Sequence, residues 1–324
     1  MSLRVFLVFL RALWGTVFLR LLGRSPWARL PFQVDMIARL LKLDWAQVRD
    51  WPVARLRADL ERRPLPRTAT DKVRVRPAEG APVPSVWVEP SAGADDRVVL
   101  YFHGGSYLFG NHRTHADTLA RVALEARARV LAPDYRLAPE HPYPAQREDA
   151  LAVYRWLREQ VPPERVVLAG ESAGGNLVIA ALLALRDAGE PAPAGGAVIS
   201  AWLDLAATRP SMEGNAATDY GDREMLLAQA RLFAGGVPLD DPGVSPLYAD
   251  LTRLPPLYVM AGGGERLLDE NAELVARVRA AGGEAELDEV AGHPHAPIFL
   301  AEYSSAAREA VTRMGGWIRR HTGG

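Results

Sequence analysis

The sequence predicts an α/β fold in which helices cover both faces of a mostly parallel sheet. Two observations favour it. Short apolar runs alternate with segments of helical period from about residue 73 to the C-terminal region. The 324 residues, 48% of them hydrophobic, are enough for one large domain with an appended subdomain, or for two smaller domains.

The expected elements follow in order from residue 73. VRVRP at 73–77 and VPSVWVEP at 83–90 indicate an opening antiparallel pair. RVVLYF at 97–102 is a continuous apolar run, typical of a buried strand. Later strands are expected at 129–135, 165–170, 197–200, 255–262 and 284–292. Helices are expected at 114–127, 145–160, 173–188, 267–281 and 299–320. Ligands of such sheets bind beyond the carboxyl ends of the strands.

Two segments fall outside this alternation. Residues 203–250 contain irregular sequence rich in Asp and Pro, with one helix expected near 223–234. We expect this segment to fold with residues 1–70 as a helical cap. Residues 71–202 and 251–324 then form the main domain.

Residues 3–23 are strongly apolar but are interrupted by arginines. Arg11 lies near the centre, where an arginine costs about 2.5–3.5 kcal/mol on membrane-insertion scales, so a spanning helix is not expected. Arg4 and Arg11 share one helical face and Arg20 lies nearly opposite, which favours two short amphipathic helices meeting near Gly15. We expect this segment to pack in the cap; contact with a membrane surface is the alternative.

Composition excludes several classes of protein. The 38 basic and 39 acidic residues give a net charge of -1, without the basic surplus of a nucleic-acid partner. Without cysteine there is no disulfide, thiolate zinc site or cysteine nucleophile, and a cytoplasmic location is expected, with peripheral membrane association as the alternative. No metal site is expected. The remaining histidines lack ligand spacing and are interpreted as surface or loop residues: His112, His115, His141 and His321.

Residues 170–174, Gly-Glu-Ser-Ala-Gly, match the G-x-S-x-G nucleophile elbow of α/β-hydrolases. An apolar strand precedes the motif and a helix rich in alanine and leucine follows it. A sharp turn between them lifts a serine hydroxyl into the cleft, and its flanking glycines allow close backbone approach. Ser172 is therefore the candidate nucleophile, and the expected fold is the α/β-hydrolase fold.

A second glycine motif, His103-Gly-Gly-Ser, ends the strand at 97–102 and resembles an HGGG-type oxyanion loop. Backbone N–H groups of such a loop point at the oxygen that becomes negative during acyl transfer. The predicted oxyanion donors are Gly104, Gly105, Ser106 and Ala173. His103 is interpreted as a residue that fixes the loop by hydrogen bonding.

These motifs together resemble the bacterial hormone-sensitive-lipase-like esterases. The matching stretches are His103 to Tyr107, Asp134 to Glu140, Gly170 to Gly175 and Glu265 to Glu270. The subgroup is similar to the monoterpene ε-lactone hydrolases and acetyl-ester hydrolases. The resemblance implies esterase chemistry, an N-terminal cap, no metal or cofactor, and often a homodimer.

The family's acid lies in a D-P-L-x-D-[ED] pattern after a late strand. This chain has Glu265-Arg-Leu-Leu-Asp-Glu there, which makes Glu265 the candidate acid, since a glutamate can also orient a histidine. Asp269 and Glu270 are the alternatives. They are expected inside the next helix, as capping or surface charges.

The candidate base follows the last expected strand. Gly292-His-Pro-His resembles the family's G-M-P-H, which assigns the role to His295. His293 remains the competitor. The order serine, acid, histidine is that of α/β-hydrolases.

We therefore expect a carboxylesterase that cleaves short- to medium-chain acyl esters through an acyl-enzyme, with a small-molecule ester as its partner. The candidate pocket residues are Tyr107, Leu108, Phe109 and Trp202, which could equally belong to the core. The same triad permits a lactone, carbamate or amide hydrolase. Plant gibberellin receptors resemble this family but lack the histidine, so three filled triad positions favour an enzyme over a receptor.

Overall fold

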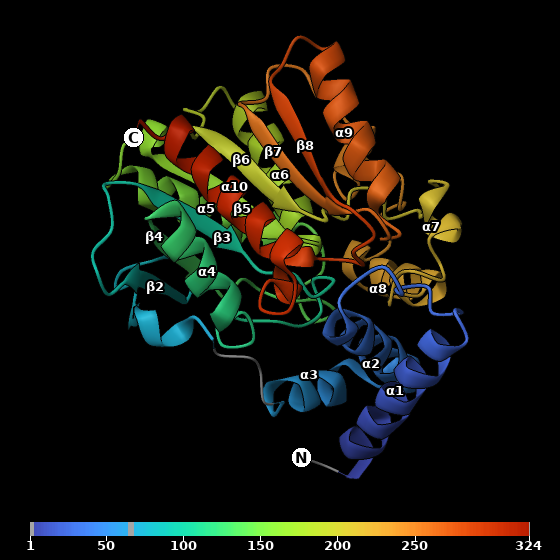
Figure 1. Cartoon of the computed structure of the whole chain (residues 1–324). Helices are drawn as coiled ribbons and strands as arrows, with labels where there is room; N and C mark the ends of the chain where they lie inside the picture. The colour runs from blue at the N-terminus through green and yellow to red at the C-terminus, as the bar shows by residue number, and fades with distance from the viewer. Residues whose placement is uncertain (1–2, 64–67, 324) are drawn as a thin grey trace.

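A computed structural model describes residues 3–63 and 68–323. Residues 1–2, 64–67 and 324 lie outside the described residues, and with them small parts of the expected cap segment 1–70 and of the segment 251–324. The described strands form an eight-stranded sheet in the order β1-β2-β4-β3-β5-β6-β7-β8 (Figure 1). The α/β class predicted from the sequence is confirmed.

The strands lie close to their expected positions, and they are β1 (Val73–Pro77), β2 (Ser85–Pro90), β3 (Val98–Phe102), β4 (Arg129–Pro133), β5 (Val166–Glu171), β6 (Gly195–Ile199), β7 (Leu257–Gly262) and β8 (Ala285–Val290). Strand β2 is antiparallel to β1, as predicted for the opening pair, and it is also antiparallel to β4. All other neighbouring strands are parallel. Strands β3, β5, β6 and β7 are buried throughout, because helices cover both faces.

Each face of the sheet has its own helices and its own apolar core. Helices α4 (Ala116–Ala126) and α10 (Ser305–His321) cover one face, whereas α5 (Ala145–Arg158), α6 (Ala173–Asp187) and α9 (Leu268–Ala280) cover the other. In β5, Val166 and Leu168 pack toward α5 and α6, while Val167 and Ala169 pack toward α4 and α10. This alternation follows from the two-residue period of a strand.

The N-terminal segment forms α1 (Leu3–Leu21), α2 (Phe32–Val48) and α3 (Val53–Glu61). The prediction of two short helices meeting near Gly15 is wrong, because α1 runs through that position unbroken. Gly15 marks a close approach to α2, where a Cβ would lie 3.2 Å from the Cδ of Arg39. Arg4 and Arg20 reach acidic partners along this interface, at 2.6 Å from Asp44 and 2.7 Å from Asp35.

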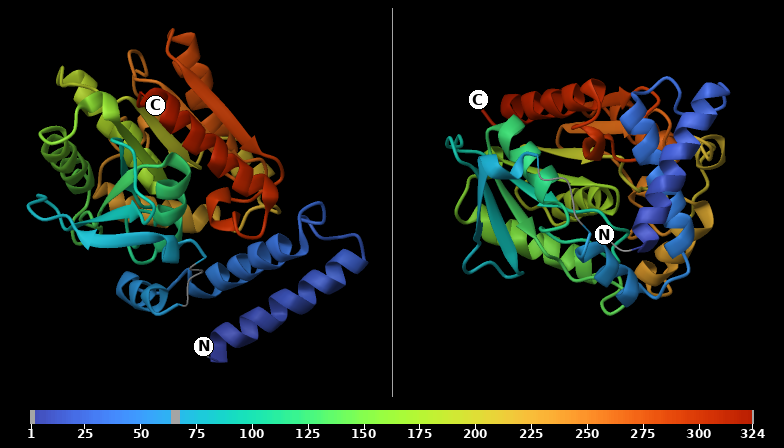
Figure 2. Two further views of the ribbon diagram at one scale, coloured as in Figure 1. Left: turned by 60° about the vertical axis from the view of Figure 1, so that its left-hand side comes forward. Right: turned by 60° about the horizontal axis from the view of Figure 1, so that its bottom comes forward.

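The segment 203–250 contributes α7 (Ser211–Gly214) and α8 (Arg223–Ala234). Figures 1 and 2 place α1–α3, α7 and α8 on one side of the sheet. Trp27 Nε1 donates to the Thr218 carbonyl at 2.7 Å, and Lys42 Nζ donates to that of Ala216 at 2.6 Å. These bonds join the N-terminal segment to the segment 203–250. The role of the two segments as a cap stays a prediction.

Candidate active site

The three predicted triad residues follow the carboxyl ends of parallel strands. Ser172 comes directly after β5, Glu265 lies three residues beyond β7, and His295 lies five residues beyond β8. Strands β5, β6, β7 and β8 are consecutive neighbours in the sheet. The topology therefore brings all three residues to one edge of the sheet, as the sequence predicted.

Ser172 occupies a strained turn. Its backbone has φ 56° and ψ −120°, a conformation that residues with a β-carbon rarely adopt. A Cβ on Gly170 would lie 2.6 Å from the Phe102 carbonyl oxygen, and one on Gly174 would lie 2.0 Å from it. The turn therefore requires glycine on both sides. Ser172 is partly exposed, whereas Glu171 and Ala173 beside it are buried, so the turn presents the hydroxyl to solvent.

A buried carboxylate faces the candidate base. Glu265 is fully buried, and its Oε2 accepts a hydrogen bond from Ser200 Oγ and lies 3.7 Å from His295 Nδ1. Ser200 Oγ in turn accepts the Ala296 N–H at 3.0 Å. Glu265 Oε1 and His295 Nδ1 are both buried without a hydrogen-bond partner among the described residues. Closing the gap by about 1 Å would form the bond, and catalytic hydrogen bonds of free enzymes are often long.

The two groups shift each other's pKa values. Burial opposes a charged imidazole, but Glu265, with a smaller contribution from Asp219, outweighs it and raises the pKa of His295 above its usual range. Burial raises the pKa of Glu265, although His295 and the Ser200 hydroxyl oppose that rise. Glu265 therefore stabilises a protonated imidazole, which is the form that a general base reaches during acyl transfer.

Asp219 fixes the loops on both sides of this pair. Its Oδ1 accepts the His295 N–H at 3.1 Å, and its Oδ2 accepts the Arg266 N–H at 2.9 Å. The Tyr220 hydroxyl donates to the His295 carbonyl at 2.9 Å, and its ring meets the imidazole edge-on. Sequence reasoning missed Asp219, because nothing in its local pattern separates it from the other acids of residues 203–250.

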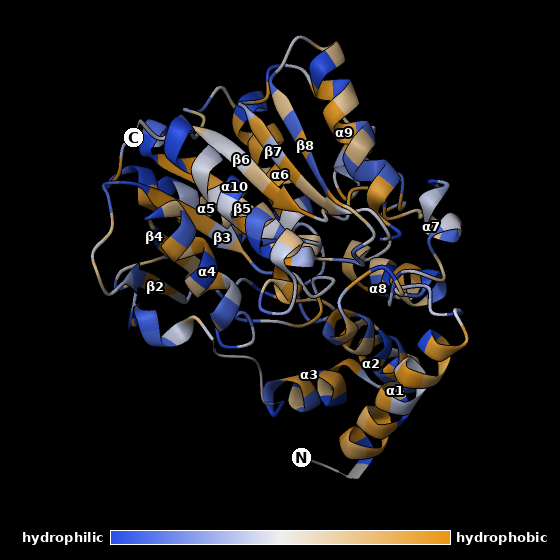
Figure 3. Cartoon of the chain, viewed as in Figure 1, coloured by the Kyte–Doolittle hydropathy of each residue, from blue (hydrophilic) through white to orange (hydrophobic). Residues whose placement is uncertain are grey.

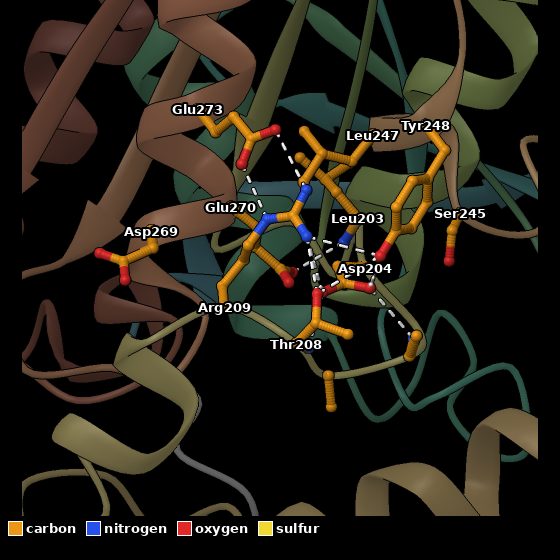
Figure 4. Close-up of polar contacts among 12 residues, drawn as sticks. Leu203, Asp204, Thr208, Arg209, Ser245, Leu247, Tyr248, Asp269, Glu270 and Glu273 are labelled. Atoms are coloured by element: carbon orange, nitrogen blue, oxygen red, sulfur yellow. Dashed lines mark hydrogen bonds and ion pairs between the residues drawn. The ribbon is translucent and has the colours of Figure 1, made fainter. Parts of the chain in front are cut away.

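The competing residues make structural contacts elsewhere. His293 is buried, with Nε2 at 2.8 Å from Ser304 Oγ and Nδ1 at 3.0 Å from the Ala291 carbonyl. Asp269 accepts the Ser211 N–H at 2.7 Å. Glu270 accepts the Leu203 N–H at 2.8 Å (Figure 4). The geometry therefore favours His295 as the base and Glu265 as the acid.

Figure 4 shows the surroundings of Asp269 and Glu270. They belong to a polar network that ties residues 203–211 to α9. Arg209 joins this segment to α9: its Nε lies 2.7 Å from Glu273 on α9, and its Nη1 lies 3.5 Å from Asp204. The Tyr248 hydroxyl donates to Asp204 at 2.9 Å.

The oxyanion loop corrects one prediction. The Gly104 N–H donates to the Glu171 carboxylate, which removes Gly104 from the predicted set of donors. The N–H groups of Gly105, Ser106 and Ala173 have no acceptor among the described residues and remain candidates. Ser106 takes a left-handed φ of 53°, so a residue with a β-carbon does fit where the family motif has glycine. At Gly105, with φ 113°, a Cβ would lie 2.0 Å from the Phe109 carbonyl oxygen.

Behind this loop lies a buried polar cluster. His115, expected from the sequence to be an ordinary loop residue, places Nε2 at 2.8 Å from Glu171 Oε1, so that interpretation is wrong. Burial opposes both charges, yet each partner outweighs it: the pKa of Glu171 is lowered and that of His115 is raised. The Tyr101 hydroxyl also donates to Glu171. His103 fixes the loop, with Nδ1 at 2.7 Å from the Gly104 carbonyl.

The predicted pocket residues divide into two groups. Tyr107, Leu108 and Trp202 are each 1% exposed and belong to the apolar core, which favours the core alternative for all three. Phe109 is half-buried, and its ring lies 5.6 Å from that of Trp45 on α2. Of the four, Phe109 alone retains a surface that a substrate could reach.

The N-terminal helices contact both loops of the site. Arg57 on α3 donates to the carbonyls of Leu108 and Ala138, at 2.5 Å and 2.6 Å, and pairs with Glu140 at 2.8 Å. Lys42 on α2 donates to the Asp219 carbonyl at 3.0 Å. No group of three or more His, Asp or Glu side chains in residues 3–63 and 68–323 could hold a metal ion.

Comparison with known proteins agrees with this geometry. A family model for the alpha/beta hydrolase fold matches residues 99–299. An acetyl-hydrolase of Streptomyces hygroscopicus is 37% identical over 90% of this chain and 97% of its own. Carboxylesterase NlhH of Mycobacterium tuberculosis is 35% identical over 67% of this chain and 71% of its own.

Solved structures extend the likeness over the whole length. An esterase from the bacterial hormone-sensitive lipase family superposes with a TM-score of 0.77 at 37% identity, covering 100% of this chain and 99% of the other. A hormone-sensitive lipase from a metagenome library superposes with a TM-score of 0.82 at 32% identity, covering 88% and 97%. The family-model match includes β3 to β8 and therefore the strand ends that carry Ser172, Glu265 and His295.

Proposed function

Since the chain belongs to the bacterial hormone-sensitive-lipase-like esterases of the α/β-hydrolase fold, we propose that it hydrolyses carboxylic esters with Ser172, His295 and Glu265 as its triad. The observation that carries the assignment is Ser172 in its strained turn, at the sheet edge where the buried Glu265 faces His295. A serine so placed, with a histidine and carboxylate following in that order, is the arrangement of acyl-transfer enzymes.

The proposed reaction has two steps. His295 takes the proton of Ser172 while its oxygen attacks the ester carbonyl, and Glu265 stabilises the resulting imidazolium. The N–H groups of Gly105, Ser106 and Ala173 hold the negative oxygen of the tetrahedral intermediate. His295 then gives its proton to the leaving alcohol. In the second step a water gives a proton to His295 and attacks the acyl-enzyme carbonyl. His295 then returns this proton to the Ser172 oxygen as the carboxylic acid leaves.

We further propose a short- to medium-chain acyl group as substrate. The Streptomyces hygroscopicus relative is named an acetyl-hydrolase. The side chains of Tyr107, Leu108 and Trp202 fill the core, while Phe109 and Trp45 offer an apolar surface beside the oxyanion loop. Lactones, carbamates and amides are the alternative substrates on the same triad. Rates for p-nitrophenyl esters from acetate to palmitate, with lactone and amide controls, distinguish these substrates.

The assignment of the nucleophile has its own test. Ser172→Ala should abolish nearly all turnover, because the triad without its nucleophile retains only the catalysis due to binding and the oxyanion hole. A fluorophosphonate should label the native protein and leave this variant unlabelled. Native-like circular dichroism together with unchanged ester turnover in Ser172→Ala would contradict the proposal.

A further inference from the structure

Exposed apolar side chains are concentrated on one helix. Of the nine large apolar side chains exposed in the described residues, six fall between positions 6 and 22: Phe6, Leu7, Trp14, Phe18, Leu21 and Leu22. Trp14 is 68% exposed, Phe18 62% and Leu21 81%. Exposed aromatic and leucine side chains grouped in this way mark an interaction surface rather than ordinary surface variation.

The spacing places the principal members on one face. Leu7, Trp14, Phe18 and Leu21 recur at seven, four and three residues, the period of a single helical stripe. The opposite face packs on α2, where Val8, for example, is 2% exposed. Figure 2 shows α1 at the outside of the molecule with α2 between it and the sheet, and Figure 3 shows how largely hydrophobic it is. Nothing in the described chain covers this outer face.

The charges around the outer face have one sign. Residues 3–34 contain five arginines and no aspartate or glutamate. Arg4 and Arg20 pair with carboxylates of α2. The other three, Arg11, Arg24 and Arg29, have no ion pair within residues 3–63 and 68–323. Arg11 lies four residues from Leu7 and three from Trp14, within the apolar stripe.

A groove adjoins Arg11 on this helix. Its volume is about 320 Å³. It is lined by Arg4, Leu7, Val8, Leu10, Arg11 and Gln47. The groove combines an apolar wall with a guanidinium that lacks a carboxylate partner.

We propose that the outer face of α1 docks the enzyme on an anionic membrane surface. The apolar stripe would lie at the boundary between headgroups and acyl chains, with Trp14 at the depth that tryptophan favours. The free arginines would contact anionic headgroups, and one such headgroup fits the groove beside Arg11. No helix of residues 3–63 or 68–323 has both the length and the apolar character to cross a bilayer, so the contact lies on the surface.

A second copy of the chain fits this face less well. A twofold contact through α1 would bring two copies of Arg11 together, with no carboxylate on either outer face to compensate. An anionic bilayer supplies the missing negative charge as well as an apolar layer. The charge pattern therefore favours lipid over self-association.

Cosedimentation of the full chain with vesicles tests the proposal. The probes are vesicles of phosphatidylcholine alone and of phosphatidylcholine mixed with phosphatidylglycerol, at low and high salt. The variants are Trp14→Ser combined with Phe18→Ser, and Arg11→Glu. Leu232→Ser is the matched control, since Leu232 is an exposed apolar residue on α8, away from α1. Turnover of a soluble p-nitrophenyl ester reports that each variant is folded.

The native protein and the Leu232→Ser control should bind the anionic vesicles, more weakly at high salt. Both α1 variants should bind at least roughly tenfold more weakly while keeping native turnover of the soluble ester. Absence of native binding, equal binding to neutral vesicles, or an equal loss in the control would each overturn the proposal. Light scattering provides a further test. A native dimer that the Trp14 and Phe18 double variant dissociates would also overturn the proposal, because a second copy would then cover the outer face.

Discussion

His115 Nε2 lies 2.8 Å from Oε1 of Glu171, the residue that immediately precedes the candidate nucleophile. The same carboxylate accepts the Gly104 N–H and the Tyr101 hydroxyl. One buried group thus joins the nucleophile turn to the oxyanion loop. Since His115 touches neither the nucleophile nor the candidate oxyanion donors, we interpret it as a positioning residue for that loop.

His115→Ala should therefore lower kcat more than it changes KM. Misplacing a catalytic group by about 1 Å costs on the order of a hundredfold in rate, so a loss of roughly ten- to a hundredfold is expected. The variant should also lose roughly 3–5 kcal/mol of stability, because Glu171 loses its buried partner. Steady-state kinetics and urea denaturation measure both effects. His141→Ala, at an exposed position, is the control, and equal effects in the two variants would contradict the positioning role.

The two histidines of the last loop should behave differently. His295→Ala should lose at least about a thousandfold in kcat, as removal of a triad member does. His293→Ala should instead cost stability, since His293 contacts Ser304, whose Oγ also accepts the Ala307 N–H at the start of α10. A loss of about 1 kcal/mol is typical of a weakened helix cap. Kinetics and thermal unfolding of both variants separate the roles, and the reverse ranking would assign the base to His293.

The acid limb of the pH profile should report His295. A general base must be neutral, and Glu265 raises the pKa of His295, so kcat/KM should fall as pH drops through a value above about 6.5. Glu265→Gln removes the negative charge, which should displace this limb to lower pH and reduce kcat by about ten-thousandfold. Glu273→Gln, which removes a carboxylate that pairs with Arg209 and Arg277 on the surface of α9, is the control. An acid limb unmoved in Glu265→Gln would indicate that another group sets it.

These raised and lowered pKa values also fix signs for stability. The pKa of His295 is raised in the folded state by Glu265. The interaction of the two therefore stabilises the fold fully at a pH below the unfolded pKa of histidine. This stabilisation is lost as pH rises through the raised pKa. The pKa of Glu171 is lowered, so its contribution is present above the unfolded pKa of glutamate and is lost as pH falls through the lowered value. Urea denaturation across pH would follow both trends.

The sequence predicted the strands and the nucleophile turn because their constraints are local. The glycines beside Ser172 avoid overlap with the backbone of β3, and any chain with this turn needs them. The pairing of His115 with Glu171 spans 56 residues, and it involves a variable position of the nucleophile motif and a histidine that belongs to no motif. Arg4 and Arg20 of α1 likewise pair with distant carboxylates, on α2 and α3. Contacts of this kind become visible only once the loops and helices are placed in space.

Lys42 links α2 to the catalytic loops. Its Nζ donates to the carbonyls of Ala216, Ala217 and Asp219 at 2.6, 3.2 and 3.0 Å. The Asp219 carboxylate then holds the backbone of His295. The lysine therefore reaches the base through one intervening residue, and burial lowers its own pKa.

Lys42→Met keeps much of the side-chain length but leaves three carbonyls without their donor. Each lost bond to a charged donor contributes roughly 1.5–3 kcal/mol at most, and water can replace part of it at this half-buried position. We expect a stability loss of about 1–3 kcal/mol and a roughly tenfold lower kcat, with KM less affected, because His295 loses part of its backbone support.

Lys72→Met is the matched control: Lys72 is the other lysine of the chain and is exposed before β1. The rate of fluorophosphonate labelling at Ser172 should fall in parallel with kcat, since both require the same proton transfer to His295. A Lys42→Met protein that is destabilised yet labels and turns over at the native rate would show that the lysine supports only the fold.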